Sequence, residues 1–328
     1  MRRREFIAAL GSVAVWPPVV RAQQPATPMV GFLADGSPEG FAPRTAAFQR
    51  GLSDMGFVVG QNVAIEFRWA RGRYDLLATL AHDLVRQRVS AIVTAGSEKV
   101  TRAAKDATTT IPIVATVAGD PVKHGLVASV NRPGGNLTVV SLFTSSSNAL
   151  VGKRVALLHE LVPKATSLGW LVDTNILDYD DQLHELQSAA QAFGLKVEIA
   201  RVPRESELEP AFASLIRGGV GVLLETGPVF YSTRERVVAL ATHASVPMLY
   251  EWRTFVDEGG LMSYGSDIGA VYRQAGVYAG RVLKGEKVGD LPVFQQSKIE
   301  LIINLKTVKA LGLTVPANLL ALADEVIE

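Results

Sequence analysis

Side chains that follow short apolar runs are the residues of this sequence best placed to bind a small ligand. The apolar runs are typical of strands, and in open parallel sheets ligands bind beyond the carboxyl ends of the strands. Hydroxyls, carboxylates and rings at these places can bind a small organic molecule. The candidate ligand-binding residues are Ser37, Gly96, Ser97, Asp120, Ser141, Phe143, Asp173, Glu225, Tyr250, Tyr264 and Asp267.

Two of these candidates begin stretches that favour a helix or a turn. The hydroxyl of Ser97 and the amides after it can hold a carboxylate, although a plain N-cap has the same sequence pattern. Asp120 precedes a proline in "GDPVKHGLV" and can accept a hydrogen bond from a ligand amine or cap the next turn. Both interpretations stay open for each residue.

The aromatic and acidic candidates also have two interpretations. Tyr250 and Tyr264 can stack on a ligand or hydrogen-bond to it, but buried tyrosines are also common in cores. Acids beside strand ends can bind an ammonium group, yet they often cap helices or face solvent. The acids concerned are Asp173, Glu225, Glu251 and Asp267.

No catalytic set is recognisable in the sequence. The five histidines, at positions 82, 124, 159, 184 and 243, stand singly and without ligand-like spacing, and the chain has no cysteine. The nucleotide-binding patterns G-x-G-x-x-G and G-x-x-x-x-G-K-[ST] and the nucleophile elbow G-x-S-x-G are missing. We therefore expect no catalytic residue, no metal and no cofactor.

Strand-like and helix-like segments alternate twice along the chain, which predicts an α/β protein. Runs that are apolar on both faces, such as 91–95 and 219–224, indicate parallel strands covered by helices. The pattern predicts two doubly wound parallel-sheet lobes. The expected strands fall within 29–36, 62–70, 89–97, 111–120, 136–143, 166–175, 195–202, 219–227, 246–252 and 259–267. The expected helices are 42–55, 75–86, 99–107, 182–193, 207–216, 233–244 and 268–283.

The C-terminal part predicts how the two lobes are joined. A helix, a strand-like segment "KIELIINL" and a short last helix follow the second alternation, although two independent lobes need only one connection. We expect this tail to return to both lobes, so that several crossings form a hinge. The first lobe is predicted at 28–141 plus about 266–293, and the second at 142–265 plus about 294–328.

The first residues have the pattern of an export signal. Arginines at the start precede an apolar run, and "VRA" ends it with a small residue, which predicts cleavage after Ala22. Arg3 and Arg4, followed by Phe6 and Ile7, fit the twin-arginine type, while the general secretion route stays open. Since the run is too short to span a bilayer, we expect a free periplasmic protein without a membrane anchor.

The charge of the processed chain argues against nucleic acid as a partner. Removing residues 1–22 takes away four arginines and one glutamate, which lowers the formal net charge from +1 to −2. No basic excess then remains to bind a phosphate backbone. The expected partner is therefore a small molecule.

Three segments together resemble a known family. They are "DPVKHGLV" with "RPGGN" at 120–136, "YGSD" at 264–267 with the helix after it, and the C-terminal 301–328. The chain is similar to substrate-binding components of ABC transporters, of the tryptophan- and tyrosine-type ABC substrate-binding family. The resemblance covers the chain after the signal and implies a periplasmic-binding-protein fold of the first type. It also implies that three crossings join the lobes, with Gly96, Ser97, Asp120, Ser141 and Tyr264 to Asp267 near the cleft.

The resemblance implies capture of a small, amino-acid-like or aromatic solute for a membrane permease driven by an ATPase. One departure is the acidic segment "DTNILDYDD" at 173–181, which argues against an aromatic amino acid as ligand and leaves cationic and neutral ligands open. Two alternatives use the same cleft: a ligand-sensing receptor module, and a secreted enzyme with Asp120, Glu225 or Asp267 as acid and base.

Overall fold

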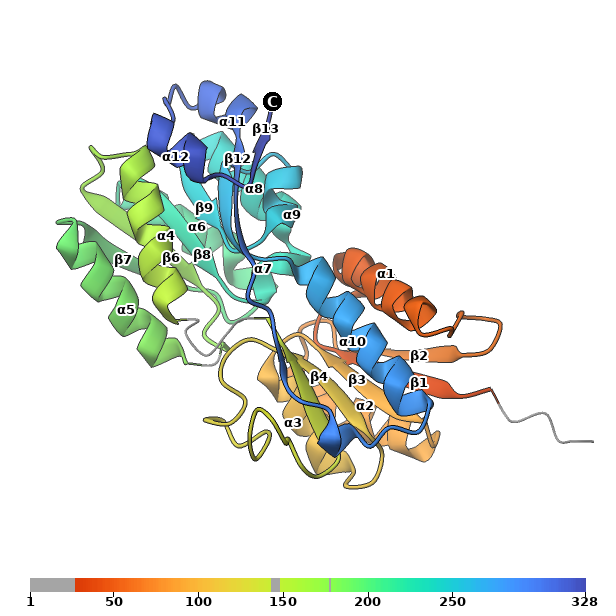
Figure 1. Cartoon of the computed structure of the whole chain (residues 1–328). Coiled ribbons are helices and arrows are strands. Elements are labelled where there is room, and N and C mark those ends of the chain that lie inside the picture. Colours follow the sequence, from red (N-terminus) through yellow and green to blue (C-terminus); the bar gives the residue numbers. More distant parts are fainter. Residues whose placement is uncertain (1–26, 143–147, 177) are drawn as a thin grey trace, which may run out of the picture.

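The computed structural model describes residues 27–142, 148–176 and 178–328 and contains two α/β lobes, each built around one sheet (Figure 1). The predicted fold class is therefore confirmed. The expected signal at 1–22 and the candidate Phe143 lie outside the described residues. In the part of the chain that is described, no helix is both long and apolar enough to span a bilayer.

The first lobe has a six-stranded sheet in the order β11-β5-β4-β3-β1-β2, and its strand pairs are parallel. Strands β3, β4 and β5 are buried along their whole length, as expected when helices cover both faces of a parallel sheet. The strands are β1 (Met29–Ala34), β2 (Ala64–Trp69), β3 (Ala91–Ala95), β4 (Ile113–Val117), β5 (Leu137–Ser141) and β11 (Phe294–Gln295). The helices are α1 (Pro38–Asp54), α2 (Leu77–Arg86), α3 (Glu98–Ala107) and α10 (Ile268–Leu283).

The second lobe has a seven-stranded sheet in the order β13-β12-β10-β9-β8-β6-β7. Its strands are β6 (Ser167–Val172), β7 (Lys196–Arg201), β8 (Val222–Thr226), β9 (Met248–Tyr250), β10 (Met262–Ser266), β12 (Ile299–Asn304) and β13 (Glu325–Ile327). Its helices are α4 (Asn148–Leu161), α5 (Tyr179–Ala192), α6 (Leu208–Arg217), α7 (Val229–Ser232), α8 (Arg234–Ala244), α9 (Arg253–Asp257), α11 (Leu305–Ala310) and α12 (Ala317–Leu322). Short 3-10 turns occupy Tyr74–Leu76, Glu205–Glu207 and Val288–Asp290.

One strand pair of the second sheet departs from the expected parallel arrangement. Strand β12 runs antiparallel to β10, while the other pairs are parallel. The reason is that β12 enters this lobe directly from β11 of the other lobe, without a crossover helix. It therefore starts at the side where β10 ends.

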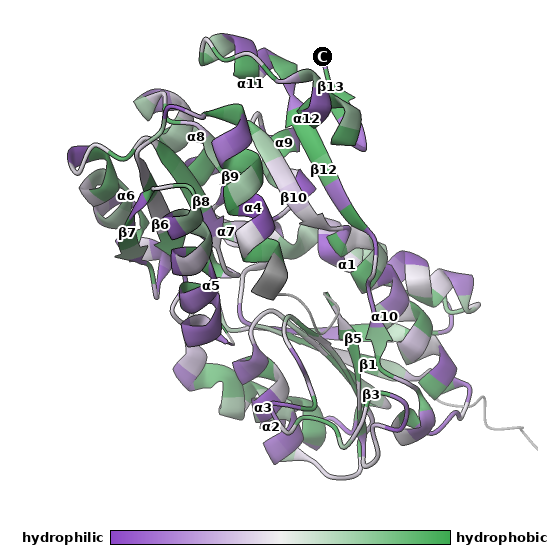
Figure 2. Ribbon diagram, turned by 60° about the vertical axis from the view of Figure 1, so that its left-hand side comes forward, coloured by the Kyte–Doolittle hydropathy of each residue, from purple (hydrophilic) through white to green (hydrophobic). Residues whose placement is uncertain are grey.

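Apolar patterning predicts most helix limits well. Helix α10 has the predicted bounds, and the other expected helices begin within three residues of their observed starts, except α1. Helix α1 begins four residues early because Ser37 caps it and Pro38 occupies its first position, while Pro43 is accommodated inside. Figure 2 shows apolar strands within both lobes and hydrophilic residues on the outer helices α2, α3 and α5.

Three connections join the lobes: between β5 and α4, between β10 and α10, and between β11 and β12. Two contacts bind these connections to each other. The Ser266 hydroxyl donates to the Leu142 carbonyl at 2.6 Å, and the Gln296 amide donates to the Ser141 carbonyl at 3.2 Å. Phe294 and Gln295 still belong to the first sheet, two residues beyond the predicted limit at about 293.

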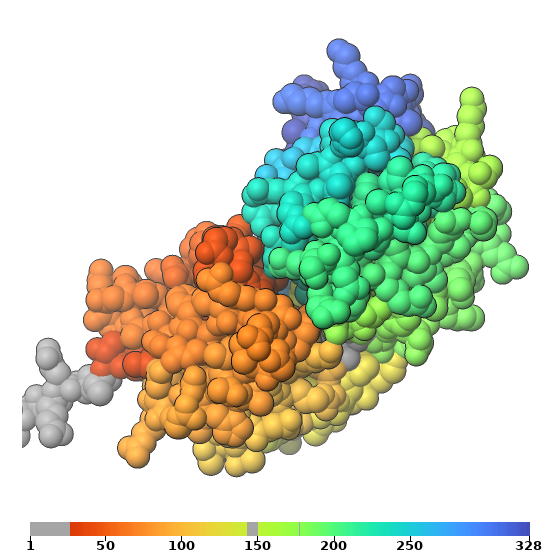
Figure 3. Space-filling model, turned by 180° about the vertical axis from the view of Figure 1, so that it is seen from behind, coloured from red at the N-terminus to blue at the C-terminus, as the bar shows by residue number. Residues whose placement is uncertain are grey.

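Helix α10 packs against α1 at very short range. A Cβ atom at Gly276 would overlap the carbonyl oxygen of Phe48, and one at Gly51 would overlap the carbonyl oxygen of Arg273. The two glycines therefore let the helix backbones touch, which anchors α10 directly after its connection to the second lobe. Figure 3 shows the two lobes from behind as separate masses that meet along one boundary.

Candidate functional site

A cavity lies between the lobes at the carboxyl ends of the strands, where parallel sheets bind ligands. About 820 Å³ of space at this cavity, open solvent at its mouth included, is not filled by protein atoms. Both lobes contribute to its lining, together with Leu142 at the hinge. The first lobe contributes Arg44, Gly96, Ser97, Glu98, Ala118, Gly119 and Tyr272. The second lobe contributes Val151, Arg154, Asn175, Ile176, Gln182, Thr226, Gly227, Pro228, Glu251 and Trp252.

A buried ion pair supports the side of the cavity formed by the second lobe. Arg154, on α4, is 2% exposed, and its Nη1 donates to Glu251 Oε1 at 2.8 Å. Its Nε donates to the Tyr264 carbonyl at 2.8 Å, while Nη2 is buried without a hydrogen-bond partner. Glu251 Oε2 accepts from the Gly227 amide at 3.2 Å. These contacts hold the guanidinium in one orientation at the cavity wall.

Arg44, on α1, is the second buried guanidinium of the cavity and is 4% exposed. Its Cζ lies 3.2 Å from the ring centre of Tyr231 and 4.5 Å from that of Phe41, so aromatic rings cover the planar group. Its Nε is buried and has no hydrogen-bond partner. Tyr231 belongs to the second lobe, so this stacking also joins the two lobes.

Two buried aspartates shape the loops that line the cavity. Asp35 Oδ2 accepts from the Ser97 amide at 2.7 Å, and burial raises the pKa of Asp35. Asp173 Oδ1 accepts from the amide and side chain of Asn175, both at 2.8 Å, and Oδ2 accepts from the Val229 amide at 3.2 Å. Burial raises the pKa of Asp173 to about 6, although these hydrogen bonds oppose the rise. Neither carboxyl lines the cavity itself.

Glu225 lies behind the cavity wall, at the end of β8, and is fully buried. Its Oε1 accepts from the Glu251 amide at 2.8 Å, whereas Oε2 has no hydrogen-bond partner. Burial and, secondarily, the charge of Glu251 raise its pKa well above the ordinary 4.5. Glu225 is therefore placed to support Glu251 and not to contact a ligand.

Replacing Glu225 with glutamine is expected to stabilise the protein increasingly as the pH rises. Because the folded pKa of Glu225 is raised, the stability that this group contributes is present in full below pH 4.5 and is lost as the pH rises through the folded pKa. The glutamine has no such loss and still accepts from the Glu251 amide. Melting temperatures from about pH 5 to about pH 8 test this. A difference between the two proteins that does not grow with pH would contradict it.

Of the residues considered from the sequence to bind ligand, Gly96, Ser97 and Glu251 line the cavity. Others take the alternative structural roles. The Ser37 hydroxyl accepts from the Gly40 amide at 3.2 Å, and Asp267 caps α10 by accepting from the Ala270 amide at 3.0 Å. Asp120 accepts from the amides of Val122 and Lys123 at 2.8 and 3.2 Å.

The remaining candidates lie inside the protein near the cavity. Tyr250 is buried and stacks on Phe255 with ring centres 4.9 Å apart, and Ser141 is buried at the end of β5. Tyr264 is half-buried and contributes its carbonyl to Arg154. The three carboxyls considered as acid and base, Asp120, Glu225 and Asp267, do not line the cavity.

Four residues that line the cavity were not among the candidates from the sequence: Arg44, Arg154, Trp252 and Tyr272. The arginines and Tyr272 lie inside helices and not at strand ends. A helical arginine is normally taken as a solvated residue, because arginine is rarely buried unless paired. For Arg154 the sequence does hold a signal, because apolar residues flank it in "LVGKRVALL".

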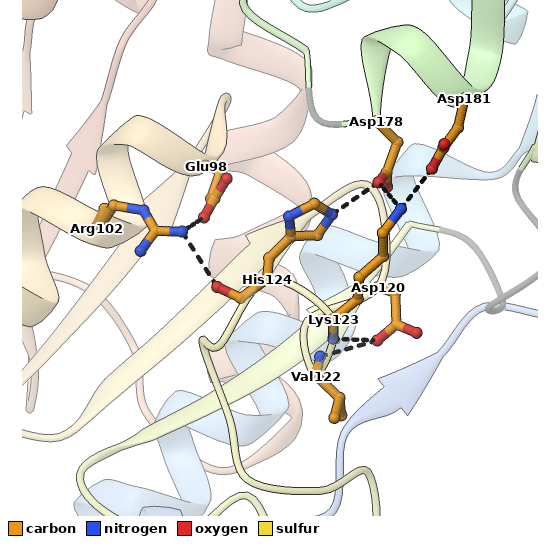
Figure 4. Close-up of polar contacts among 8 residues, drawn as sticks. All are labelled: Glu98, Arg102, Asp120, Val122, Lys123, His124, Asp178 and Asp181. Atoms are coloured by element: carbon orange, nitrogen blue, oxygen red, sulfur yellow. Dashed lines mark hydrogen bonds and ion pairs between the residues drawn. The ribbon is translucent and has the colours of Figure 1, made fainter. Parts of the chain in front are cut away.

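Salt bridges connect the two lobes directly (Figure 4). We call this cluster, formed by Lys123, His124, Asp178 and Asp181, the interlobe latch. Lys123 Nζ lies 2.6 Å from Asp178 Oδ1 and also contacts Asp181, and His124 Nε2 lies 2.9 Å from Asp178 Oδ1. Asp120 caps the loop that carries Lys123 (Figure 4). Of the acids in 173–181, Asp178 and Asp181 are thus paired with Lys123 of the other lobe, whereas Asp173 accepts from Asn175 and the Val229 amide.

Replacing Lys123 with methionine is expected to open the cleft more often. Because these two ion pairs link the lobes, their loss should weaken ligand binding by a modest factor, roughly 2- to 10-fold. Small-angle scattering of the ligand-free variant should show a larger radius of gyration. The matched control is Lys196→Met, because Lys196 pairs with Glu198 on the same strand and this ion pair does not link the two lobes. Equal behaviour of the two variants would show that the latch does not stabilise closure.

Sequence comparison identifies related proteins. The family model described as ABC transporter substrate binding protein matches residues 39–327. A tyrosine-binding protein of Clostridioides difficile (strain R20291) is 31% identical over 267 residues, which cover 81% of this chain and 75% of that protein.

Solved structures with the same fold include a domain in complex with L-Trp from Streptococcus pneumonia. It is 25% identical, has a TM-score of 0.80, and the match covers 92% of this chain and 100% of that chain. The ligand-free, open structure of a substrate-binding protein with adhesive properties from Clostridium difficile is 27% identical, with a TM-score of 0.62 and coverage of 92% and 99%. Because the identities are similar, the higher score indicates that the lobes are arranged more as in the L-Trp complex than as in the open structure.

Proposed function

The chain belongs to the ABC transporter substrate-binding protein family, and from this premise we propose that it captures a small organic solute in the interlobe cavity and delivers it to a membrane permease driven by an ATPase. The solute is amino-acid-like or aromatic. The expected signal, cleaved after Ala22, places the protein free in the periplasm. The protein binds its ligand without changing it and needs no cofactor.

The observation that carries this proposal is a cavity lined by side chains of both lobes. A ligand can hold two lobes together only if it contacts both of them in the closed state. Arg44 and Ser97 come from the first lobe, and Arg154 and Trp252 from the second. Three short connections and the interlobe latch fit a hinge that closes on a ligand.

The ligand class rests on the lining and on the relatives. Trp252 and Tyr272 offer aromatic surface, and the buried guanidiniums offer donors for a carboxylate. The tyrosine-binding relative and the L-Trp complex are similar in sequence or fold, which supports an aromatic solute.

Native mass spectrometry of the purified protein, followed by unfolding to release what it carries, tests the function. We expect a bound molecule of defined mass, and its return should raise the melting temperature by roughly 5–10 °C at 100-fold excess over Kd. L-tryptophan and L-tyrosine are the first additions, with the uncharged myo-inositol as control. An empty protein that no addition stabilises would favour the sensor or enzyme alternatives.

A further inference from the structure

We propose that the cavity selects organic anions: a carboxylate of the ligand binds the guanidinium groups of Arg44 and Arg154, one from each lobe, and a ligand ammonium group is not required. The inference rests on the proposed function and names the chemistry of its solute. It predicts that an aromatic carboxylic acid binds at least as well as the corresponding amino acid.

Two buried arginine nitrogens lie at the cavity without an acceptor in the described part of the chain. Arg44 Nε and Arg154 Nη2 are both buried without a hydrogen-bond partner, and both residues line the cavity. Buried polar groups in folded proteins are nearly always hydrogen-bonded, because leaving one unpaired is unfavourable. Two such donors at one cavity indicate that the ligand supplies the acceptors.

Arg44 carries a buried positive charge at the cavity. Within the residues that the structure describes, no carboxylate lies within 4.0 Å of Arg44. Burial raises the pKa of nearby Asp35 and the charge of Arg44 opposes this rise, but the two side chains form no hydrogen bond. Asp35 Oδ2 accepts from the Ser97 amide. Since Tyr231 and Phe41 cover the guanidinium plane, the N–H groups at its edge stay available for a bidentate carboxylate.

The acids that line the cavity are already paired. Among the described lining residues, the acids are Glu98 and Glu251. Glu98 pairs with Arg102 on its own helix, and Glu251 accepts from Arg154 and from the Gly227 amide. A ligand ammonium therefore meets no unpaired carboxylate, whereas a ligand carboxylate meets two incompletely paired guanidiniums.

The rest of the lining determines the body of the anion. Leu142, Val151, Ile176, Trp252 and Tyr272 line the same cavity. Apolar and aromatic walls around a few convergent polar groups are typical of sites for small organic ligands. The expected ligand is an aromatic or branched apolar group that carries a carboxylate.

Calorimetric titration with two matched series tests the inference. The first series is L-tryptophan, indole-3-propanoate without the ammonium, and tryptamine without the carboxylate. The second is L-tyrosine, 3-(4-hydroxyphenyl)propanoate and tyramine. In at least one series the acid should bind with a Kd equal to or below that of the amino acid, and neither amine should bind.

The variant Arg44→Met tests the residue itself. It should weaken binding of the best acid roughly 10- to 100-fold, as expected for the loss of a charged hydrogen-bond donor. Arg44→Lys keeps the positive charge but not the planar guanidinium that binds a carboxylate through two hydrogen bonds, so it should lose less affinity than Arg44→Met. Arg50→Met, on the exposed face of the same helix, is the matched control and should bind normally. Unchanged circular dichroism and melting temperature of the lysine variant would show that its fold is retained.

The outcomes separate this inference from the proposed function. If the amino acid binds tighter than its desamino acid in both series, or if an amine binds, the inference is overturned and a solute-binding protein is left. Full affinity of Arg44→Met for the acid also overturns it. If no carboxylate of either series binds, the inference fails, and mass spectrometry of the protein as purified decides the proposed function independently.

Discussion

Replacing Arg154 with methionine is expected to lower the free energy of unfolding by about 3–5 kcal/mol, because Glu251 then stays buried without its partner charge. The loss is large because Glu225 lies next to it, and the charge of Glu251 already raises the pKa of Glu225. Urea denaturation followed by tryptophan fluorescence measures the effect. The melting temperature should fall by about 2–4 °C for each kcal/mol.

The control for Arg154→Met is the double variant Arg154→Met with Glu251→Gln. The glutamine removes the unpaired charge and can still accept from the Gly227 amide, so the double variant should regain most of the lost stability. If the double variant is as unstable as the single one, the loss comes from packing and not from the buried charge.

A second large effect is expected at Gly96, where alanine should lower the free energy of unfolding by about 2–4 kcal/mol. Gly96 has φ +110°, which residues with a Cβ rarely adopt, and the added Cβ would overlap Oδ1 of Asp35. Asp35 holds the Ser97 amide, so the start of α3 would shift at the cavity. Ligand affinity should fall together with stability, as calorimetric titration and urea denaturation can show.

Gly259→Ala is the matched control for Gly96→Ala. Gly259 has a similar φ of +98°, but no atom lies within 4 Å of the position of an added Cβ. It should therefore lose only about 1–2 kcal/mol from the backbone conformation and bind ligand normally. Equal losses in the two variants would show that contact with Asp35 contributes nothing.

The fold was predictable because short segments of the sequence have the apolar patterns of strands and helices. Apolar runs at 91–95 and 219–224 became the buried strands β3 and β8, and the bounds of α10 were predicted to the residue. The start of α1 was predicted too late, because Pro43 is typical of the first turn of a helix. In the structure Ser37 caps the helix, Pro38 is its first residue and Pro43 lies inside it. The antiparallel direction of β12 arises because the chain enters this sheet from the other lobe. No local sequence pattern encodes that path.

The strand-end rule predicted the position of the site better than its chemistry. Gly96 and Ser97 line the cavity, but Ser37, Asp120 and Asp267 cap backbone amides. In a sequence, a residue that caps a helix and a residue that binds a ligand cannot be told apart, because both roles use the same residue types after a strand. Only the direction in which the side chain points distinguishes them.

The sequence by itself determined the two-lobed α/β architecture, the family resemblance and the strand ends that meet at the cleft, because hydrophobic periodicity and capping act between near neighbours in the chain. Only the tertiary structure decided the charge of the site. Arg44 and Arg154 are 110 positions apart on helices of different lobes, and they line one cavity because those lobes close on each other. The acids at 178 and 181 look like a ligand-binding rim in the sequence, yet in the structure they pair with Lys123, while the guanidiniums of Arg44 and Arg154 line the cavity.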